Sequence, residues 1–225
     1  MSSSASWSAR GAWLVDEQVI PEWLVPAARF AAQADVGSIT RFAPPANSGR
    51  HSAVLIALRS GEDGPEVVLV ERAASGGPHS GQPAFPGGVV EAHDSDAVAA
   101  ALRETWEEAG ISQEELLPVA RLPELWIPVS DYVVTPVVAW WQGRVTANVA
   151  DPQEIAAVHC VSIAELVEAG NRCRVQHPSG YVGPAFDVRG MLVWGFTAGI
   201  LDALIRGAGW ARAWDELAPP RALVI

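Results

Sequence analysis

The sequence predicts a mixed fold of the α/β (α+β) class, with several strands and at least two helices. Aliphatic and β-branched runs of strand length occur at 52–59, 66–72 and 131–141. An amphipathic segment of helical period lies between the second and third run, and the apolar segment 190–209 is a further helix pattern. Alternation of β runs with helical segments is typical of this class. With 225 residues and 49% hydrophobic content, the chain can bury a full core.

The first part of the chain predicts an extension, a linker and a hairpin. Residues 21–34 have a helical pattern with Pro26 near the start, where proline is tolerated. The Pro-, Gly- and Asn-rich stretch 41–50 predicts a linker. The runs 52–59 and 66–72 flank the turn sequence SGEDGP, so they predict a β-hairpin.

The second part of the chain predicts a strand, a strand–helix unit and a closing helix. Pro136 lies inside the run 131–141 and indicates an edge strand or a bulge. Residues 150–170 pass from a loop through a strand into a helix, with Ser162 as the N-cap. The segment 190–209 predicts an apolar helix. The predicted organisation is an extension over 1–45, one main domain over 46–210 and a tail over 211–225.

Composition limits the partners and the compartment. A net charge of −11 and a pI near 4.8 argue against nucleic acid, because an acidic chain releases no counterions from a phosphate backbone. The start lacks the pattern of a secretory signal, and the longest apolar stretch, 191–205, is too short for a membrane span. Two cysteines, Cys160 and Cys173, suit a reducing compartment. We therefore expect a cytoplasmic protein that binds neither nucleic acid nor membrane, and that needs a metal to attract an anionic small molecule.

A charged helix after a Gly-Gly turn, in residues 86–110, is the clearest functional pattern. On a helical wheel one face holds apolar residues and Thr: Val98, Leu102, Thr105, Trp106 and Ala109. The charged residues fall roughly opposite: Arg103, Glu104, Glu107 and Glu108. Glu104 and Glu108 lie one turn apart, so both carboxylates can reach one hard cation such as Mg²⁺. Arg103 can hold Glu107, and Gly88 can offer its carbonyl. A merely solvated charged face is the alternative.

At these residues the sequence resembles the Nudix hydrolase family. The family motif is matched by seven residues: Gly88, Arg103, Glu104, Glu107, Glu108, Gly110 and Ile111. Thr105 takes an apolar place. Asp94 stands where Glu is usual, and eight residues separate it from Arg103 instead of seven. The coenzyme A pyrophosphatase-like branch of the family has the same Asp and the same longer spacing.

That branch also has a signature before the motif, and the chain matches it in part. Arg72, Gly81 and the segment Phe85-Pro86-Gly87-Gly88 are present at the right intervals. Ala73 replaces the signature Ser, and Gly77 replaces a second Arg. The resemblance covers about residues 51–206 and implies a mixed sheet sandwiched between helices. The helix that carries the family motif is expected at 95–109.

The resemblance implies hydrolysis of a nucleoside diphosphate linked to another moiety, with Mg²⁺ or Mn²⁺. Coenzyme A or acyl-CoA, cut to 3′,5′-ADP and (acyl-)4′-phosphopantetheine, is the first candidate, and a homodimer is possible. ADP-ribose or NADH as substrate, or a non-catalytic binding module, are the alternatives. The implied metal ligands are Gly88, Glu104, Glu107 and Glu108. The implied substrate-binding residues are Arg72, Gly81, Phe85 and Gly87. Arg103 belongs to the catalytic set, and Glu154 is the candidate general base.

Three further groups are weaker candidates. His79 and His93 flank the Gly-Gly loop, where solvated histidines are common. Trp126 has an aromatic surface on which an adenine can stack. A zinc site formed by His159, Cys160, Cys173 and His177 is disfavoured, because His159 and Cys160 are adjacent in a predicted strand and would point to opposite faces.

Overall fold

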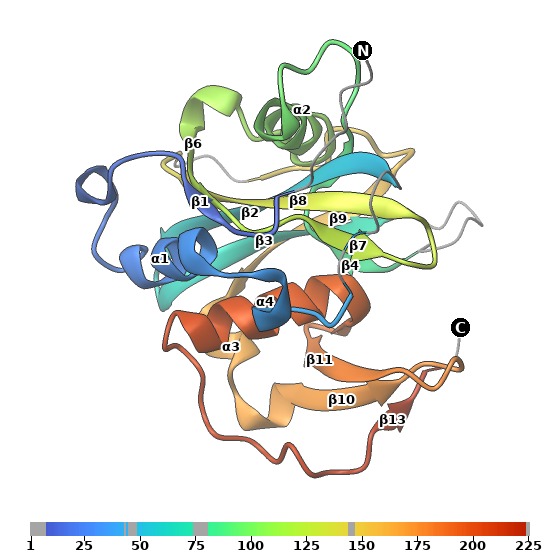
Figure 1. The fold of residues 1–225 in the computed structure, drawn as a ribbon. Coiled ribbons are helices and arrows are strands. Elements are labelled where there is room, and N and C mark those ends of the chain that lie inside the picture. Colours follow the sequence, from blue (N-terminus) through green and yellow to red (C-terminus); the bar gives the residue numbers. More distant parts are fainter. Residues whose placement is uncertain (1–7, 43, 45–48, 74–80, 144–146, 224–225) are drawn as a thin grey trace.

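A computed structural model describes residues 8–42, 44, 49–73, 81–143 and 147–223 (Figure 1). In this part of the chain a nine-stranded mixed sheet lies between helices. α2 (Ala97–Ala109) covers one face, and α1 (Val25–Gln33) and α4 (Gly195–Gly207) cover the other. The predicted mixed α/β fold, with a sheet sandwiched between helices, is confirmed.

The central sheet has the order β1-β6-β8-β2-β3-β4, while β5 pairs with β2, β7 with β8 and β9 with β3. Its strands are β1 Ala12–Trp13, β2 Arg50–Gly61, β3 Gly64–Arg72, β4 Pro83–Ala84, β5 Gly87–Val89, β6 Leu116–Arg121, β7 Leu125–Ile127, β8 Tyr132–Trp141 and β9 Ile155–Ser162. β2 and β8 are parallel, and the other pairs are antiparallel. The predicted β2–β3 hairpin is confirmed.

A second, four-stranded sheet has the order β12-β11-β10-β13 and follows the central sheet in sequence. Its strands are β10 Arg172–Gln176, β11 Val182–Val188, β12 Met191–Val193 and β13 Arg221–Ala222. The short helical segments are α3 Ile163–Leu166 and the 3-10 turns Glu17–Val19, Val36–Ser38, Gln113–Glu115 and Ala169–Asn171. Ser162 caps α3 by accepting the N–H of Glu165, and Pro26 lies in the first turn of α1, as predicted.

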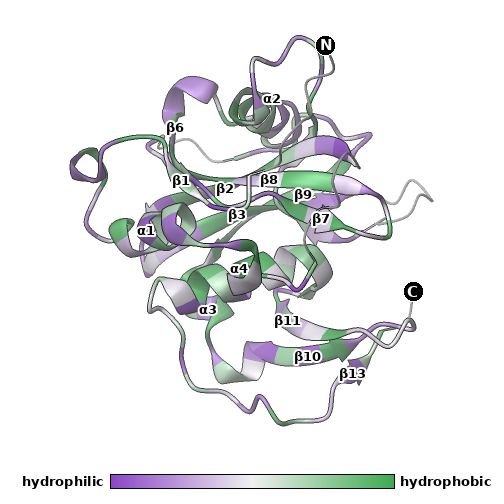
Figure 2. Ribbon diagram, viewed as in Figure 1, coloured by the Kyte–Doolittle hydropathy of each residue, from purple (hydrophilic) through white to green (hydrophobic). Residues whose placement is uncertain are grey.

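Two layers of core form because side chains alternate along the strands of the central sheet. On β2, Leu55 and Ala57 pack with the α2 layer, whereas Ile56 and Leu58 pack with the α1 and α4 layer. Figure 2 shows the central strands and the inner faces of the helices as predominantly hydrophobic. No helix in the described ranges is long and apolar enough to cross a membrane.

Pro136 lies in a central strand, so the predicted edge position or bulge in β8 is wrong. β8 pairs with β2 on one side in an unbroken register, and with β6 and β7 on the other. The β6 register ends with Arg121 opposite Val137, and β7 begins with Leu125 opposite Val134. The missing N–H of Pro136 therefore falls in the gap between these two partners, where no ladder bond is lost.

The segment 190–209 is only partly helical, so the predicted single helix is wrong at its start. Met191–Val193 pairs with β11 as β12, after a tight turn at Arg189 and Gly190 with φ angles of 53° and 78°. The helical part, α4, begins only at Gly195. The turn and the neighbouring strand override the helical pattern here. In the predicted tail, β13 pairs with β10 in parallel.

Arg172 joins the second sheet to α4. Its side chain is only 2% exposed and forms an ion pair with Asp202 of α4. The guanidinium carbon also lies 4.5 Å from the ring centre of Phe186 and 4.7 Å from that of Trp214. Because a buried cation is costly without its counter-ion, this contact fixes the second sheet and the C-terminal segment against the helix.

We predict that Asp202→Ala destabilises the fold by about 3 kcal/mol or more, because the variant leaves the Arg172 charge buried and unpaired. The matched control is Glu168→Ala, which removes an ion pair with Arg212 whose side chains are 59% and 58% exposed. That loss costs at most about 1 kcal/mol. Urea unfolding of the three proteins measures both effects, and equal stabilities of the two variants would contradict the prediction.

Candidate active site

α2 carries the charged motif, and its two ends are defined by caps. Asp96 accepts the N–H of Ala99 and begins the helix, so α2 starts two residues later than the predicted 95. Gly110 ends it in the left-handed conformation, with φ of 65°. The helix thus includes the whole run from Arg103 to Glu108.

The helix buries a stripe that differs from the predicted one. The residues of α2 that face the sheet are Ala100, Ala101, Thr105, Glu108 and Ala109. Trp106 is 52% exposed, whereas Glu108 is 3% exposed, so the assignment of Trp106 to the buried face and of Glu108 to the opposite face is wrong. Glu108 lies on the same side of α2 as the buried alanines and Thr105, so it faces the sheet.

Glu108 is a buried carboxylate held by backbone. One of its oxygens accepts the N–H of Gly87 at 3.0 Å. Burial raises the pKa of Glu108 to about 7, although the Gly87 hydrogen bond and the charge of Arg72 oppose the rise. The side chain is therefore placed in a low-dielectric site where a cation would be strongly attracted.

The Gly-Gly turn is shaped by close approaches on two sides. Gly87 has φ of 156°, and a Cβ there would lie 2.3 Å from the carbonyl oxygen of Ala53 on β2. A Cβ at Gly88 would lie 2.4 Å from a carboxylate oxygen of Glu104. The absence of side chains at these two positions lets β5 lie against both β2 and the carboxylates of α2.

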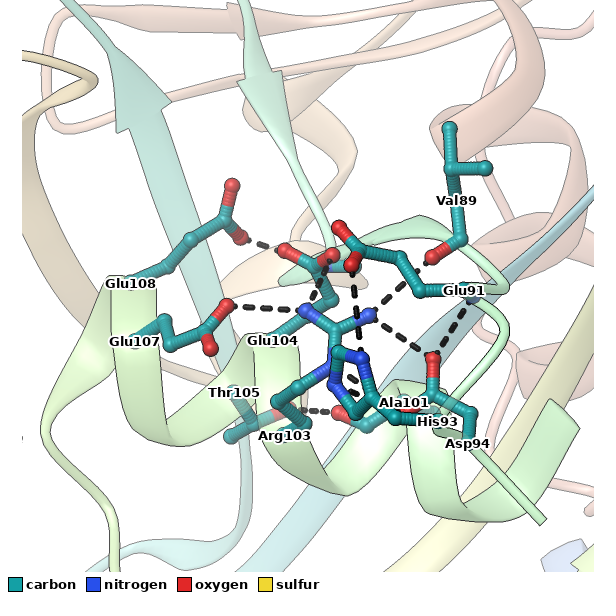
Figure 3. A network of polar contacts seen from close by, with 11 residues as sticks. Val89, Glu91, His93, Asp94, Ala101, Arg103, Glu104, Thr105, Glu107 and Glu108 are labelled. Carbon is teal, nitrogen blue, oxygen red and sulfur yellow. Dashed lines mark hydrogen bonds and ion pairs between the residues drawn. The ribbon is translucent and has the colours of Figure 1, made fainter. Parts of the chain in front are cut away.

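Arg103 donates five hydrogen bonds, and three of them connect α2 to Asp94 and Val89 in the preceding segment (Figure 3). Its Nε and Nη2 donate to the two oxygens of Asp94 at 3.0 and 2.9 Å. Nη1 donates to Glu104 at 2.8 Å and to Glu107 at 2.9 Å, and Nη2 also donates to the carbonyl of Val89 at 3.1 Å. The guanidinium therefore fixes both carboxylates relative to β5.

Asp94 is the anchor of this network. Its side chain is 3% exposed and also accepts the N–H of Glu91 at 2.8 Å. The hydrogen bond from Arg103 lowers the pKa of Asp94 to about 2. The sequence matches Asp94 to the family motif, but Asp94 was not predicted as a site residue. Its position in the motif, with eight residues between it and Arg103, is the signal that could have identified it.

Glu104 lies between Arg103 and the Gly-Gly turn. Burial raises the pKa of Glu104, and the hydrogen bond and charge of Arg103 oppose the rise. Arg103 contacts one oxygen of Glu104 and one of Glu107. Among the described residues, no three His, Cys, Asp or Glu side chains are grouped as a preformed metal cage. The arrangement thus presents hard oxygen donors on one side of α2, next to Glu108 (Figure 3).

Arg72 and Glu154 lie beside this carboxylate group. The charges of both residues act on Glu108, and that of Glu154 also acts on Glu104. The carbonyl of Glu154 accepts the N–H of Ala73 at 2.7 Å, which joins it to the end of β3. In the described part of the chain, the guanidinium of Arg72 has no hydrogen bond or ion pair, so it is free to bind an anion.

Other predicted residues lie elsewhere or support the backbone. Phe85 is 3% exposed and packs in the α1 and α4 core, so its side chain cannot line a surface site. Gly81 donates its N–H to the carbonyl of Arg72 at 2.9 Å. His93 is exposed beside Glu91, and the indole N–H of Trp126 donates to Asp131 at 3.0 Å.

Gly77 and His79 lie outside the described residues. His159 contacts Glu71 at 3.4 Å, and Cys160 packs with the α2 layer.

Comparison with known proteins identifies the family of this domain. A family model for the NUDIX domain matches residues 49–178. A protein from Enterobacter sp. (strain 638), called an uncharacterized Nudix hydrolase NudL, is 36% identical over 165 residues, which are 69% of this chain and 81% of that protein. The protein of the same name from Cronobacter sakazakii is 36% identical over 163 residues, with the same shares covered.

Solved structures are more distant. The Nudix hydrolase RenU from M. smegmatis has a TM-score of 0.48 and 19% identity, over 73% of this chain and 89% of that one. The family match and the relatives are sufficient to assign the chain to a family. The chain belongs to the Nudix family and is a Nudix hydrolase of a nucleoside diphosphate derivative. Nudix hydrolases generally use divalent metal ions.

We predict that the Asp94–Arg103 pair makes stability depend on acid pH. Because the folded pKa of Asp94 lies below its ordinary value, the pair stabilises the protein above about pH 4, and the contribution is lost as pH falls towards about 2. Urea unfolding of wild type and Asp94→Asn, without metal, measures the difference. The stability gap should be about 1.5–3 kcal/mol at pH 7 and should shrink below pH 4. A gap that is independent of pH would contradict the pair's role.

Proposed function

We propose that the protein hydrolyses the diphosphate of coenzyme A or acyl-CoA with Mg²⁺ or Mn²⁺, giving 3′,5′-ADP and (acyl-)4′-phosphopantetheine. The observation that carries the proposal is the bidentate Asp94–Arg103 pair. An Asp at this longer spacing is what the chain shares with the coenzyme A pyrophosphatase-like branch. The Arg72 guanidinium, whose charge acts on Glu108, has no hydrogen bond or ion pair among the described residues. It supports the proposal further, because it can bind a substrate phosphate.

The residues fit a hard divalent cation. Glu104, Glu107 and Glu108 supply carboxylate oxygens, and the Gly88 carbonyl is the fourth candidate donor. Burial raises the pKa of Glu108, and the charges of two nearby carboxylates, Glu104 and Glu154, raise it further. A bound cation would relieve this repulsion. When bound, the metal would neutralise charge on the diphosphate oxygens and acidify a bound water.

The chain's own groups supply the remaining chemistry. Arg103 holds Glu104 and Glu107 in place, and Arg72 orients the diphosphate. Glu154 removes a proton from the attacking water as the water oxygen bonds to phosphorus. The bond from phosphorus to the bridging oxygen then breaks, and the leaving phosphate takes the electron pair. The second candidate substrates are ADP-ribose and NADH, because Ala73 and Gly77 replace two positions of the coenzyme A signature.

We predict that Glu108→Gln lowers turnover about 100-fold or more at saturating Mg²⁺, because it removes a charge that is worth several kcal/mol at the metal. The fold should survive, since Gln has the same size and can still accept the N–H of Gly87. Glu114→Gln, at an exposed position six residues away, is the matched control. Near wild-type turnover of Glu108→Gln would remove Glu108 from the mechanism, whereas no turnover by the wild type on any of the diphosphates would favour a binding module.

We predict that the protein hydrolyses coenzyme A weakly and that the substitution Gly77→Arg increases this activity. A hydrogen bond to a charged group is worth ~1.5–3 kcal/mol, or ~10–150-fold in affinity, so a missing phosphate-binding Arg weakens recognition. The measurement is kcat/KM on coenzyme A, ADP-ribose and NADH for both forms, with products identified. A clear preference for ADP-ribose or NADH, unchanged by the new Arg, would transfer the assignment to that substrate.

A further inference from the structure

The turn at residues 151–154, Asp-Pro-Gln-Glu, leads directly into β9 and carries Glu154. The side-chain oxygen of Asp151 accepts the N–H of Gln153 at 2.8 Å. The carbonyl of Asp151 accepts the N–H groups of Glu154 at 3.2 Å and Ile155 at 2.9 Å. Asp at the first position and Pro at the second are favoured in such a turn, so the local sequence encodes this conformation.

The same segment is anchored on both sides. Upstream, the N–H of Asn148 donates to the carbonyl of Ala109 at 3.0 Å, and the N–H of Ala150 donates to the carbonyl of Glu108 at 3.3 Å. These carbonyls belong to the last turn of α2, where helix carbonyls lack partners within the helix. Downstream, the backbone carbonyl of Glu154 accepts the N–H of Ala73 at 2.7 Å. The segment therefore connects the C-terminal end of α2 to the end of β3.

We infer that Asp151 is a positioning residue that fixes the Glu154 carboxylate relative to the carboxylates of α2. The inference rests on the proposed function, in which Glu154 is the general base. The two anchors fix where the segment begins and ends, but between them the side chain of Asp151 sets the course of the chain through Gln153 to Glu154. Loss of this bond loosens the turn on the N-terminal side of Glu154 and so changes the direction of its side chain, while the carbonyl of Glu154 stays bonded to Ala73.

The consequence for catalysis follows from the sensitivity of proton transfer to geometry. A positioned general base contributes ~10²–10⁴-fold, and a displacement of about 1 Å can cost ~100-fold. Asp151 does not touch the diphosphate in this account, so substrate binding should be little affected. An Asn at this position can still accept the N–H of Gln153, whereas Ala cannot.

The test compares Asp151→Ala, Asp151→Asn, Glu154→Gln and the double variant Asp151→Ala/Glu154→Gln, at saturating Mg²⁺ on the substrate with the highest wild-type kcat/KM. Asp151→Ala should lower kcat about tenfold or more with KM changed less than about twofold. Asp151→Asn should restore kcat, and the double variant should be no slower than Glu154→Gln alone. Gln153→Ala, which keeps every backbone hydrogen bond of the turn, is the matched control and should be unchanged.

Each contrary result has a separate meaning. Wild-type kcat in Asp151→Ala, equal losses in the Ala and Asn variants, or additive losses in the double variant would overturn the positioning role. If Glu154→Gln keeps full kcat while Glu108→Gln is inactive, the hydrolase assignment stands and the inference fails. If wild type hydrolyses none of the diphosphates, the proposed function fails and the inference falls with it.

Discussion

The guanidinium of Arg103 is the contact on which the candidate site depends. It is planar and always charged, and its fork of donors binds Asp94 through both carboxylate oxygens. The remaining donors reach Glu104, Glu107 and the carbonyl of Val89, so one side chain links the loop, β5 and α2. Without it, two acidic residues on one helix turn would repel each other and lose their common orientation.

The packing around this contact buries a carboxylate, and burial of a charged group costs free energy. α2 rests on the sheet through alanines, and this close packing buries the Glu108 carboxylate, raising its pKa to about 7. The backbone N–H of Gly87 offsets part of the cost, and the glycines of β5 leave room for Glu104. A carboxylate that is buried, held in place and close to other carboxylates suits a site that is completed by a cation. The same helix end holds the segment that carries Glu154, so the candidate metal ligands and the candidate base are positioned by the same helix.

Much of this arrangement could be predicted from local sequence, and the misses have physical causes. The β2–β3 hairpin, the cap at Ser162 and the Arg103–Glu107 contact follow from local spacing, and the structure has all three. The burial of Glu108 and the exposure of Trp106 could not be predicted, because they depend on which side of α2 packs against the sheet. The strand at Met191 was missed because its pairing with β11 is a tertiary contact. Phe85 fitted a substrate-binding signature but packs in the core, since a motif does not show on which face a side chain lies.

We propose that the carboxylates of α2, fixed by Arg103, hold a divalent cation. The most direct measurement is anomalous diffraction from crystals of the protein grown with Mn²⁺. We predict a manganese peak coordinated directly by Glu104 and Glu108, with the Arg103–Asp94 pair intact. A well-ordered site with no peak at saturating Mn²⁺, or a peak that avoids both residues, would contradict it.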